Sequence, residues 1–598
     1  MRTPLVLGRF ALHLALGLAI AAGGSACAGI DDEEAGAGAE LQPEGLLGKT
    51  DNAGVPGLPV ETSDRDTQVW TVTNQWEDRD TPAARAAGPA WPADSGLTWD
   101  QKYGAWIQGM PRIQGHETYY ETFAIVTPWG KTLPSPKLEC AETAIFLRDT
   151  FAAWYQLPFY MTGQDEGGAR VYFGHFGART ANGKFGGSPS YRDAYRDYSD
   201  LAGRGAEYLA ANWPTDAKLR AKKLLKSNPD GTNDLQPMIA PDAHVGAYFD
   251  EIHLNKRAGH FTVLLLEYFG SVNLTDSRNT YNLKAPAVRA GDVLLERWQK
   301  IGIGHTLNVK NVQPLEDGKT MAELASGSMP RRQAMWADAF ASKGYFTNEA
   351  MGGEGVASDG TPYYKLGGGL KRFRVAKIVR GTWMNTWMAG DEASWISDDD
   401  WDHLKTRPKE FENFLGEVPP EQQKIALLKI IDDNRNHLRL YPASCTAREN
   451  RERAFSKLYD LGSRALNMDH EKIDREYRQL EDYVFAQLEY TKSKTCCWNS
   501  TTSFMHQIVM DYVKAKQAES ATCTEPEVFM NENGGYQKFA DFAARTGRAA
   551  QWKAWSEDEP CAQRDVVNDT KAYAWITDWC TTQTPPAPEP EPTPEPTP

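Results

Sequence analysis

The stretch "LECAETAIFLRDTFAAWYQLPF", residues 138–159, contains a single cysteine followed by an apolar pattern with helical spacing. Pro158 cannot continue a helix and predicts its end. Cys140 therefore lies at the start of a predicted helix over residues 141–156, where the helix N-terminus favours a thiolate. The apolar residues that recur every three or four positions are Ala144, Leu147, Phe151 and Trp154.

Strand-like segments follow this helix farther along the chain. The segments "GDVLLERW" (291–298), "HTLNVKNV" (305–312) and "FRVAKIV" (373–379) are rich in β-forming residues. The turn "EDGK" (316–319) predicts that the chain returns to a further strand near "TMAELAS" (320–326). Residues 65–400 are therefore expected to mix helices and strands.

The pattern becomes helical from about residue 418. Four segments have apolar residues at helical spacing, and they carry or flank most of the cysteines. We therefore expect a separate α-helical domain here. The segments are residues 419–440, 447–466, 471–492 and 503–516.

The cysteines divide unevenly along the chain. Of eight, one lies near the N-terminus, and six lie in the last quarter, where they predict three disulfides. Six cysteines allow fifteen pairings, and the sequence does not choose among them. Cys140 is left without a partner, so it is either a buried small hydrophobic residue or a reactive thiol. The six are Cys445, Cys496, Cys497, Cys523, Cys561 and Cys580.

The segment "RAGDVLLERWQKIGIGHTLNVKNV" (289–312) resembles the "GD…GH" strand pair of papain-like bacterial amidohydrolases, namely the NlpC-type murein peptidases and the CHAP enzymes. "LECAETAIFLRDTF" (138–151) resembles their cysteine helix. The separation between Cys140 and His305 is much longer than in compact members, so a large insertion is expected at about 161–260.

The resemblance implies an α+β fold in which the cysteine helix packs on an antiparallel sheet. It also implies a thiol hydrolase that needs no cofactor. Cys140 would attack an amide carbonyl, and His305 would accept the thiol proton. Glu323 on the return strand is the preferred residue to orient the imidazole, with Asn311 as the alternative. A transglutaminase-like enzyme uses a related layout and transfers the acyl group to an amine instead.

Other candidate sites in the sequence have weaker signals. "HETYY" (116–120) has Tyr120 where a zinc protease needs its second histidine. His244, His253 and His260 lie near acidic residues, but their spacing fits no known metal site. We found no nucleophile-elbow, P-loop or dinucleotide-binding motif. No metal site is therefore predicted.

The N-terminus has the pattern of a bacterial export signal. Two arginines precede the short apolar run "ALHLALGLAIAA" (11–22), and "GGSAC" ends at Cys27. This ending resembles a lipobox, in which the cysteine is lipid-modified, although Gly24 replaces the preferred leucine. Ala28 at the next position favours the outer membrane. The resemblance implies a lipid-anchored protein of the bacterial cell envelope, with simple secretion as the alternative.

The composition restricts the classes of partner that this protein is expected to bind. The 598 residues carry a net charge of -15, which argues against binding the phosphates of nucleic acid. The expected partner is a peptide or cell-wall substrate, with membrane contact only through the anchor. A non-enzymatic alternative is an envelope lipoprotein that binds a partner through its Trp-rich first domain and its helical domain. The predicted units are 1–27 (signal), 28–64 (flexible linker), 65–400 (catalytic domain), 401–583 (helical cysteine-rich domain) and 584–598 (Pro/Glu-rich tail).

Overall fold

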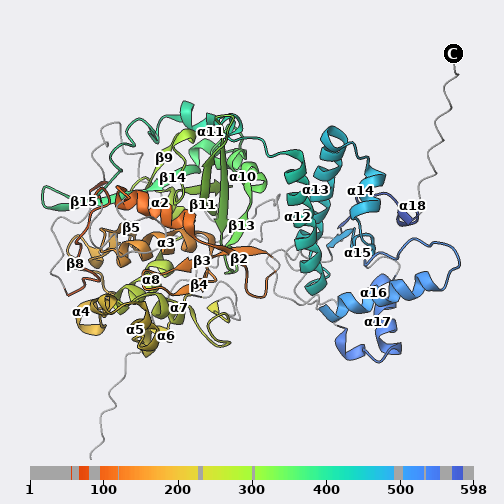
Figure 1. Ribbon diagram of the computed structural model, residues 1–598, viewed down its shortest axis with the longest axis horizontal. Helices are drawn as coiled ribbons and strands as arrows, with labels where there is room; N and C mark the ends of the chain where they lie inside the picture. Colours follow the sequence, from red (N-terminus) through yellow and green to blue (C-terminus); the bar gives the residue numbers. More distant parts are fainter. Residues whose placement is uncertain are drawn as a thin grey trace, which may run out of the picture.

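The protein has a mixed α+β fold with antiparallel sheets (Figure 1). The computed structural model describes residues 55–56, 66–79, 95–118, 120–225, 234–299, 304–357, 359–490, 503–530, 534–552 and 569–583. The predictions for Cys27, Cys496, Cys497, Cys561 and the tail 584–598 lie outside these residues. Of the predicted linker 28–64, only Val55–Pro56 is described; it forms β1, which pairs with β16 (Thr382–Thr386).

A seven-stranded antiparallel sheet organises the first part of the chain, in the order β13-β12-β11-β10-β14-β9-β17. The predicted strands near 291–298, 305–312 and 320–326 are confirmed as three adjacent strands of this sheet. The strands are β9 (Thr280–Leu283), β10 (Val293–Arg297), β11 (Gly304–Pro314), β12 (Thr320–Ser326), β13 (Met335–Ala337), β14 (Gly369–Phe373) and β17 (Trp395–Ile396).

Both faces of the sheet are covered. Val293 and Leu295 belong to the core that includes the cysteine helix, α3 (Cys140–Trp154). Leu294 points to the other face, toward α10 (Ala339–Phe346) and α11 (Trp401–Phe414). Alternate residues of each strand therefore lie in two different cores.

The cysteine helix is confirmed, but it is more enclosed than its pattern predicts. Almost all of its residues are buried, including Arg148 and Asp149. The sheet lies on one side of α3, and α2 (Trp99–Gly109) and α8 (Lys256–Tyr268) pack against it elsewhere. Its polar residues are only partly satisfied inside the core: Thr262 Oγ1 donates to Asp149 Oδ2 at 2.7 Å, whereas Asp149 Oδ1 and Thr150 Oγ1 are buried without a hydrogen-bond partner among the described residues.

The region predicted as an insertion, about 161–260, contains a four-stranded antiparallel sheet and short helices. Its helices are short, and the 3-10 helix Ser199–Arg204 ends where Gly205 adopts a positive φ of 86°. The elements are β5 (Tyr160–Gln164), β6 (Arg170–Gly174), β7 (Gly177–Thr180), β8 (Gly183–Lys184), α4 (Tyr191–Ala194), α5 (Ala206–Ala211), α6 (Ala217–Arg220), α7 (Val245–Ile252) and α9 (Ser271–Thr275).

Two smaller sheets complete the first part. The single strand predicted at 373–379 is divided at Arg374, so that β14 ends in the large sheet while β15 (Val375–Val379) pairs with β16. The other small sheet contains β2 (Arg112–Gln114), β3 (Glu121–Val126) and β4 (Thr132–Pro134).

The later part of the described chain is mainly helical, with two apolar cores. The helix predicted over 471–492 ends at Arg478, whose guanidinium forms buried ion pairs with Glu452 and Asp474. The elements are α12 (Pro420–Leu440), α13 (Cys445–Leu461), α14 (His470–Tyr477), α15 (Leu480–Val484), β18 (Leu488–Tyr490), α16 (Ser503–Ala518), α17 (Gly535–Arg545), β19 (Asp569–Lys571) and α18 (Trp579–Gln583).

Disulfides occur in this helical part. Cys523 and Cys580 are bonded to each other, and Cys445 is also disulfide-bonded. Cys140 is the free cysteine of the described residues. Within those same residues, no helix combines the length and the apolar character needed to cross a membrane.

Candidate functional site

Cys140 is the first residue of α3 and lies at the edge of β11. Its Sγ donates to the carbonyl oxygen of Gly304 at 3.9 Å, and the backbone N–H of Thr306 also bonds the sulfur. These two backbone groups flank His305. The thiol therefore contacts the strand directly beside the predicted catalytic histidine.

The edge of β11 is open to the thiol because β12 ends early. β12 pairs with β11 only from Asn308 onward, so no described strand pairs with Gly304 and Thr306 on that side, and the Gly304 N–H donates to Ser271 Oγ at 3.2 Å. After β12, Gly327 passes against the start of α3, where a Cβ would lie 2.3 Å from the Leu138 oxygen. The backbone after β12 therefore approaches the start of α3 at a distance that leaves no room for a side chain at residue 327.

The His305 side chain leaves β11 on the face of the sheet opposite α3. Its position on β11 alternates with Thr306 and matches Leu307, which lies in the core under α10 and α11. Among the described residues, no hydrogen bond joins the imidazole to Cys140. The Cys140 sulfur lies beside the backbone at the edge of β11. The His305 side chain leaves β11 on one face of the sheet, so the two side chains reach this edge from different directions.

Both groups are neutral near pH 7. Burial raises the pKa of the Cys140 thiol to about 11; the Thr306 N–H acts against this shift, and the Glu139 carboxylate adds to it. Burial lowers the pKa of His305 to about 4, and the Arg332 guanidinium lowers it further. The resting pair is therefore a thiol and a neutral imidazole rather than an ion pair.

The acidic residues beside Cys140 have a cationic partner that the sequence did not reveal. Arg331 contacts the Glu142 carboxylate at 2.7 Å and lies 3.7 Å from Glu139. Arg331 and Glu142 are both buried, so this pair neutralises a carboxylate two residues from Cys140. The pair joins residues nearly two hundred positions apart, which explains why no local pattern indicated it.

The strand register brings a different carboxylate to His305 than the one predicted. Glu323 lies opposite Asn311 and accepts its amide hydrogen bond at 3.0 Å. Asn311 follows His305 by six residues, which is about 20 Å along a strand. Neither residue is therefore near the imidazole.

Glu296 on β10 is instead the direct cross-strand partner of His305. Paired residues on adjacent antiparallel strands leave the same face with Cβ atoms about 5 Å apart. Glu296 is buried, burial raises the pKa of its carboxyl group, and the carboxyl group accepts from Asn348 Nδ2 at 3.4 Å and bonds Trp298 rather than His305. It stands inside "GDVLLERW", so the sequence contained it, but only the register identifies it as the neighbour of His305.

The other histidines of the sequence analysis are used in separate pairs. His244 lies 3.4 Å from Asp234, and His260 lies 3.4 Å from Asp216. His253 is buried, and burial lowers its pKa to about 3. Within the described ranges, no three or more His, Cys, Asp or Glu side chains are grouped so as to hold a metal ion.

Comparisons with protein-family models, with curated proteins and with solved structures gave no match to this chain.

Proposed function

We propose that the first part of the chain, residues 65–400, is a papain-like cysteine hydrolase that cleaves an amide bond. The observation that carries the proposal is the contact of the Cys140 sulfur with the backbone on both sides of His305. The order of elements supports it: a helix that starts at the cysteine packs on an antiparallel sheet whose strand starts at the histidine.

The chemistry follows from a neutral pair. The imidazole turns around the open edge of β11 toward the sulfur when substrate binds. As sulfur attacks the carbonyl carbon, the thiol proton passes to His305, which then donates it to the leaving amine. Water, deprotonated by His305, next hydrolyses the thioester and restores the thiol. The backbone N–H of Cys140 donates to the developing oxyanion.

Glu296 replaces Glu323 in this proposal as the residue that orients His305. A carboxylate beside the imidazole fixes the ring and stabilises the imidazolium that forms during the attack. The register supports this role, because Glu296 and His305 face each other across β10 and β11.

The cellular setting remains a proposal drawn from the sequence. We propose a lipid anchor at Cys27, an envelope location and cell-wall peptide as the substrate. Replacement of Cys27 by serine should then move the protein from the membrane fraction to the soluble fraction. Unchanged fractionation would remove the anchor from the proposal.

Acyl trapping tests the enzyme. The folded protein is treated with p-nitrophenyl acetate, and the Cys140 peptide is analysed by mass spectrometry. We expect acetylation that disappears in His305→Ala and persists in His403→Ala, which changes an exposed histidine of α11. Acetylation that is equal in His305→Ala, or absent from the folded protein, would overturn the Cys–His mechanism and favour the non-enzymatic binding protein. Added amines that capture the acyl group faster than water would identify an acyl transferase.

A further inference from the structure

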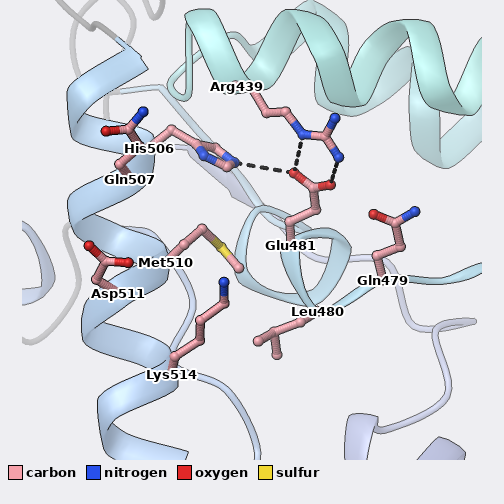
Figure 2. A pocket seen from close by; sticks show the side chains of 9 residues that line it. All are labelled: Arg439, Gln479, Leu480, Glu481, His506, Gln507, Met510, Asp511 and Lys514. Carbon is pink, nitrogen blue, oxygen red and sulfur yellow. Dashed lines mark hydrogen bonds and ion pairs between the residues drawn. The ribbon is translucent and has the colours of Figure 1, made fainter.

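A cavity of about 370 Å³ lies in the helical part, between the end of α12, the start of α15 and one side of α16 (Figure 2). Its size falls within the usual range for small-ligand pockets, about 300–1,000 Å³. Leu480 and Met510 supply apolar walls, and the remaining lining is polar. The helices that form this cavity are different from the elements that position Cys140.

The carboxylate in this cavity already has its partners. Arg439 Nε donates to Glu481 Oε2 at 3.1 Å, its Nη2 donates to Oε1, and His506 Nε2 lies 3.3 Å from Oε2. Burial alone would raise the pKa of Glu481, but the His506 and Arg439 hydrogen bonds hold it at about 2. Glu481 thus stays ionised and is neutralised from within the protein.

The second carboxylate of the lining is also paired. Asp511 accepts a hydrogen bond from Arg548 Nη1 at 2.6 Å, so its charge is balanced by a residue outside the lining. Neither carboxylate is therefore available to bind a cationic ligand.

Lys514 is the group that remains. Its ammonium makes no hydrogen bond or ion pair with any residue of the described chain, and it points into the space beside Glu481 (Figure 2). Lys514 is exposed at the mouth of the cavity, and the exposed Gln507 amide points away from it (Figure 2). In a protein of net charge -15, this cavity offers one ammonium group that no described residue neutralises.

We propose that the cavity binds a small carboxylate with an apolar body, such as the free C-terminus of a peptide. Lys514 forms a charge-assisted hydrogen bond with the carboxylate, and Leu480 and Met510 contact the apolar side chain. The proposal is independent of the chemistry at Cys140.

Binding to the full chain is measured with two probes, acetyl-Ala-Leu with a free carboxylate and the same dipeptide as its C-terminal amide. Saturation-transfer NMR or calorimetry measures dissociation constants of the probes up to the millimolar range. Because a hydrogen bond to a charged group contributes about 1.5–3 kcal/mol, we expect the amide to bind at least about tenfold more weakly. Lys514→Met should weaken binding of the acid by a similar factor.

Lys516→Met is the matched control, because Lys516 lies on the same helix, outside the cavity lining, and pairs with Glu519 at 2.9 Å. It should leave binding within about twofold of the unchanged protein, well below the effect of losing a charged hydrogen bond. Equal binding of acid and amide, no effect of Lys514→Met in a folded variant, or no binding of either probe at millimolar concentration would overturn the proposal. Competition by inorganic phosphate as strong as by the acid would overturn the requirement for an apolar body.

Discussion

The sulfur of Cys140 lies 3.9 Å from the carbonyl oxygen of Gly304, a residue 164 positions later in the chain. This contact places a helix N-terminus against an unpaired strand edge, next to His305. It also removes the thiol from water, which explains the raised pKa of the thiol in spite of the favourable helix position.

Alkylation of Cys140 should depend steeply on pH. With a thiol pKa of about 11, the thiolate fraction at pH 7 is about 10⁻⁴. We expect the iodoacetamide rate, followed by peptide mass spectrometry, to rise from pH 7 to pH 10 and beyond. An exposed cysteine would instead level off above about pH 8.5. Fast labelling of the native protein at pH 6 would mean that the resting state is a thiolate–imidazolium pair.

Glu296→Gln should impair the proposed reaction more than Glu323→Gln. Glu296 faces His305 across the strand pair, whereas Glu323 faces Asn311. Loss of a residue that orients a general base costs about 10²-fold or more in turnover. The acetylation rate of Cys140 is the readout, and the bell-shaped pH profile of turnover should shift only in Glu296→Gln. If Glu323→Gln had the larger effect, the register would not describe the active state.

Gly327→Ala should destabilise the first part of the chain and disturb the site. The added Cβ would lie 2.3 Å from the Leu138 carbonyl oxygen and 2.7 Å from that of Glu139. Such overpacking against backbone costs about 1–3 kcal/mol. Thermal unfolding followed by tryptophan fluorescence measures the change.

Gly344→Ala is the control for this substitution, because a Cβ there would meet no atom within 4 Å and Gly344 lies inside α10. It should be neutral or stabilise the helix by up to about 1 kcal/mol. Equal behaviour of the two variants would contradict the close approach at Gly327.

Glu481 should make the helical part sensitive to acid. Its folded pKa of about 2 lies below the ordinary glutamate value of 4.5. A lowered folded pKa stabilises the native state above the unfolded pKa, and this contribution is lost as the pH falls from about 4.5 to 2. The full contribution is on the order of 3 kcal/mol.

The comparison with Glu481→Gln isolates this effect. At pH 6 the unchanged protein should have the higher melting temperature, and the difference should shrink as the pH falls from about 4.5 to 2, where Glu481 is half protonated in the native state. A difference that stays constant over this range would show that Glu481 acts through packing rather than charge.

Local patterns in the sequence were enough to locate most of the main elements. The apolar spacing after Cys140 predicted α3, and the strands β10, β11 and β12 followed from their β-forming residues and the "EDGK" turn. Predictions failed where a distant contact intervened. The helix expected over 471–492 ends at Tyr477, where the Arg478 guanidinium forms a buried ion pair with Glu452 of α13, and the strand expected at 373–379 divides between two sheets.

Local sequence was enough to place Cys140 at the start of a helix and His305 near the start of a strand, because both depend on residues a few positions away. Which side chains meet depended on how the helix and the strands pack together. This packing placed the thiol on the strand edge, Arg331 on Glu142, and Glu296 rather than Glu323 opposite His305. The physical reason is that strand register and ion pairing join residues far apart in the chain, and a shift of one residue in register exchanges the two faces of a sheet.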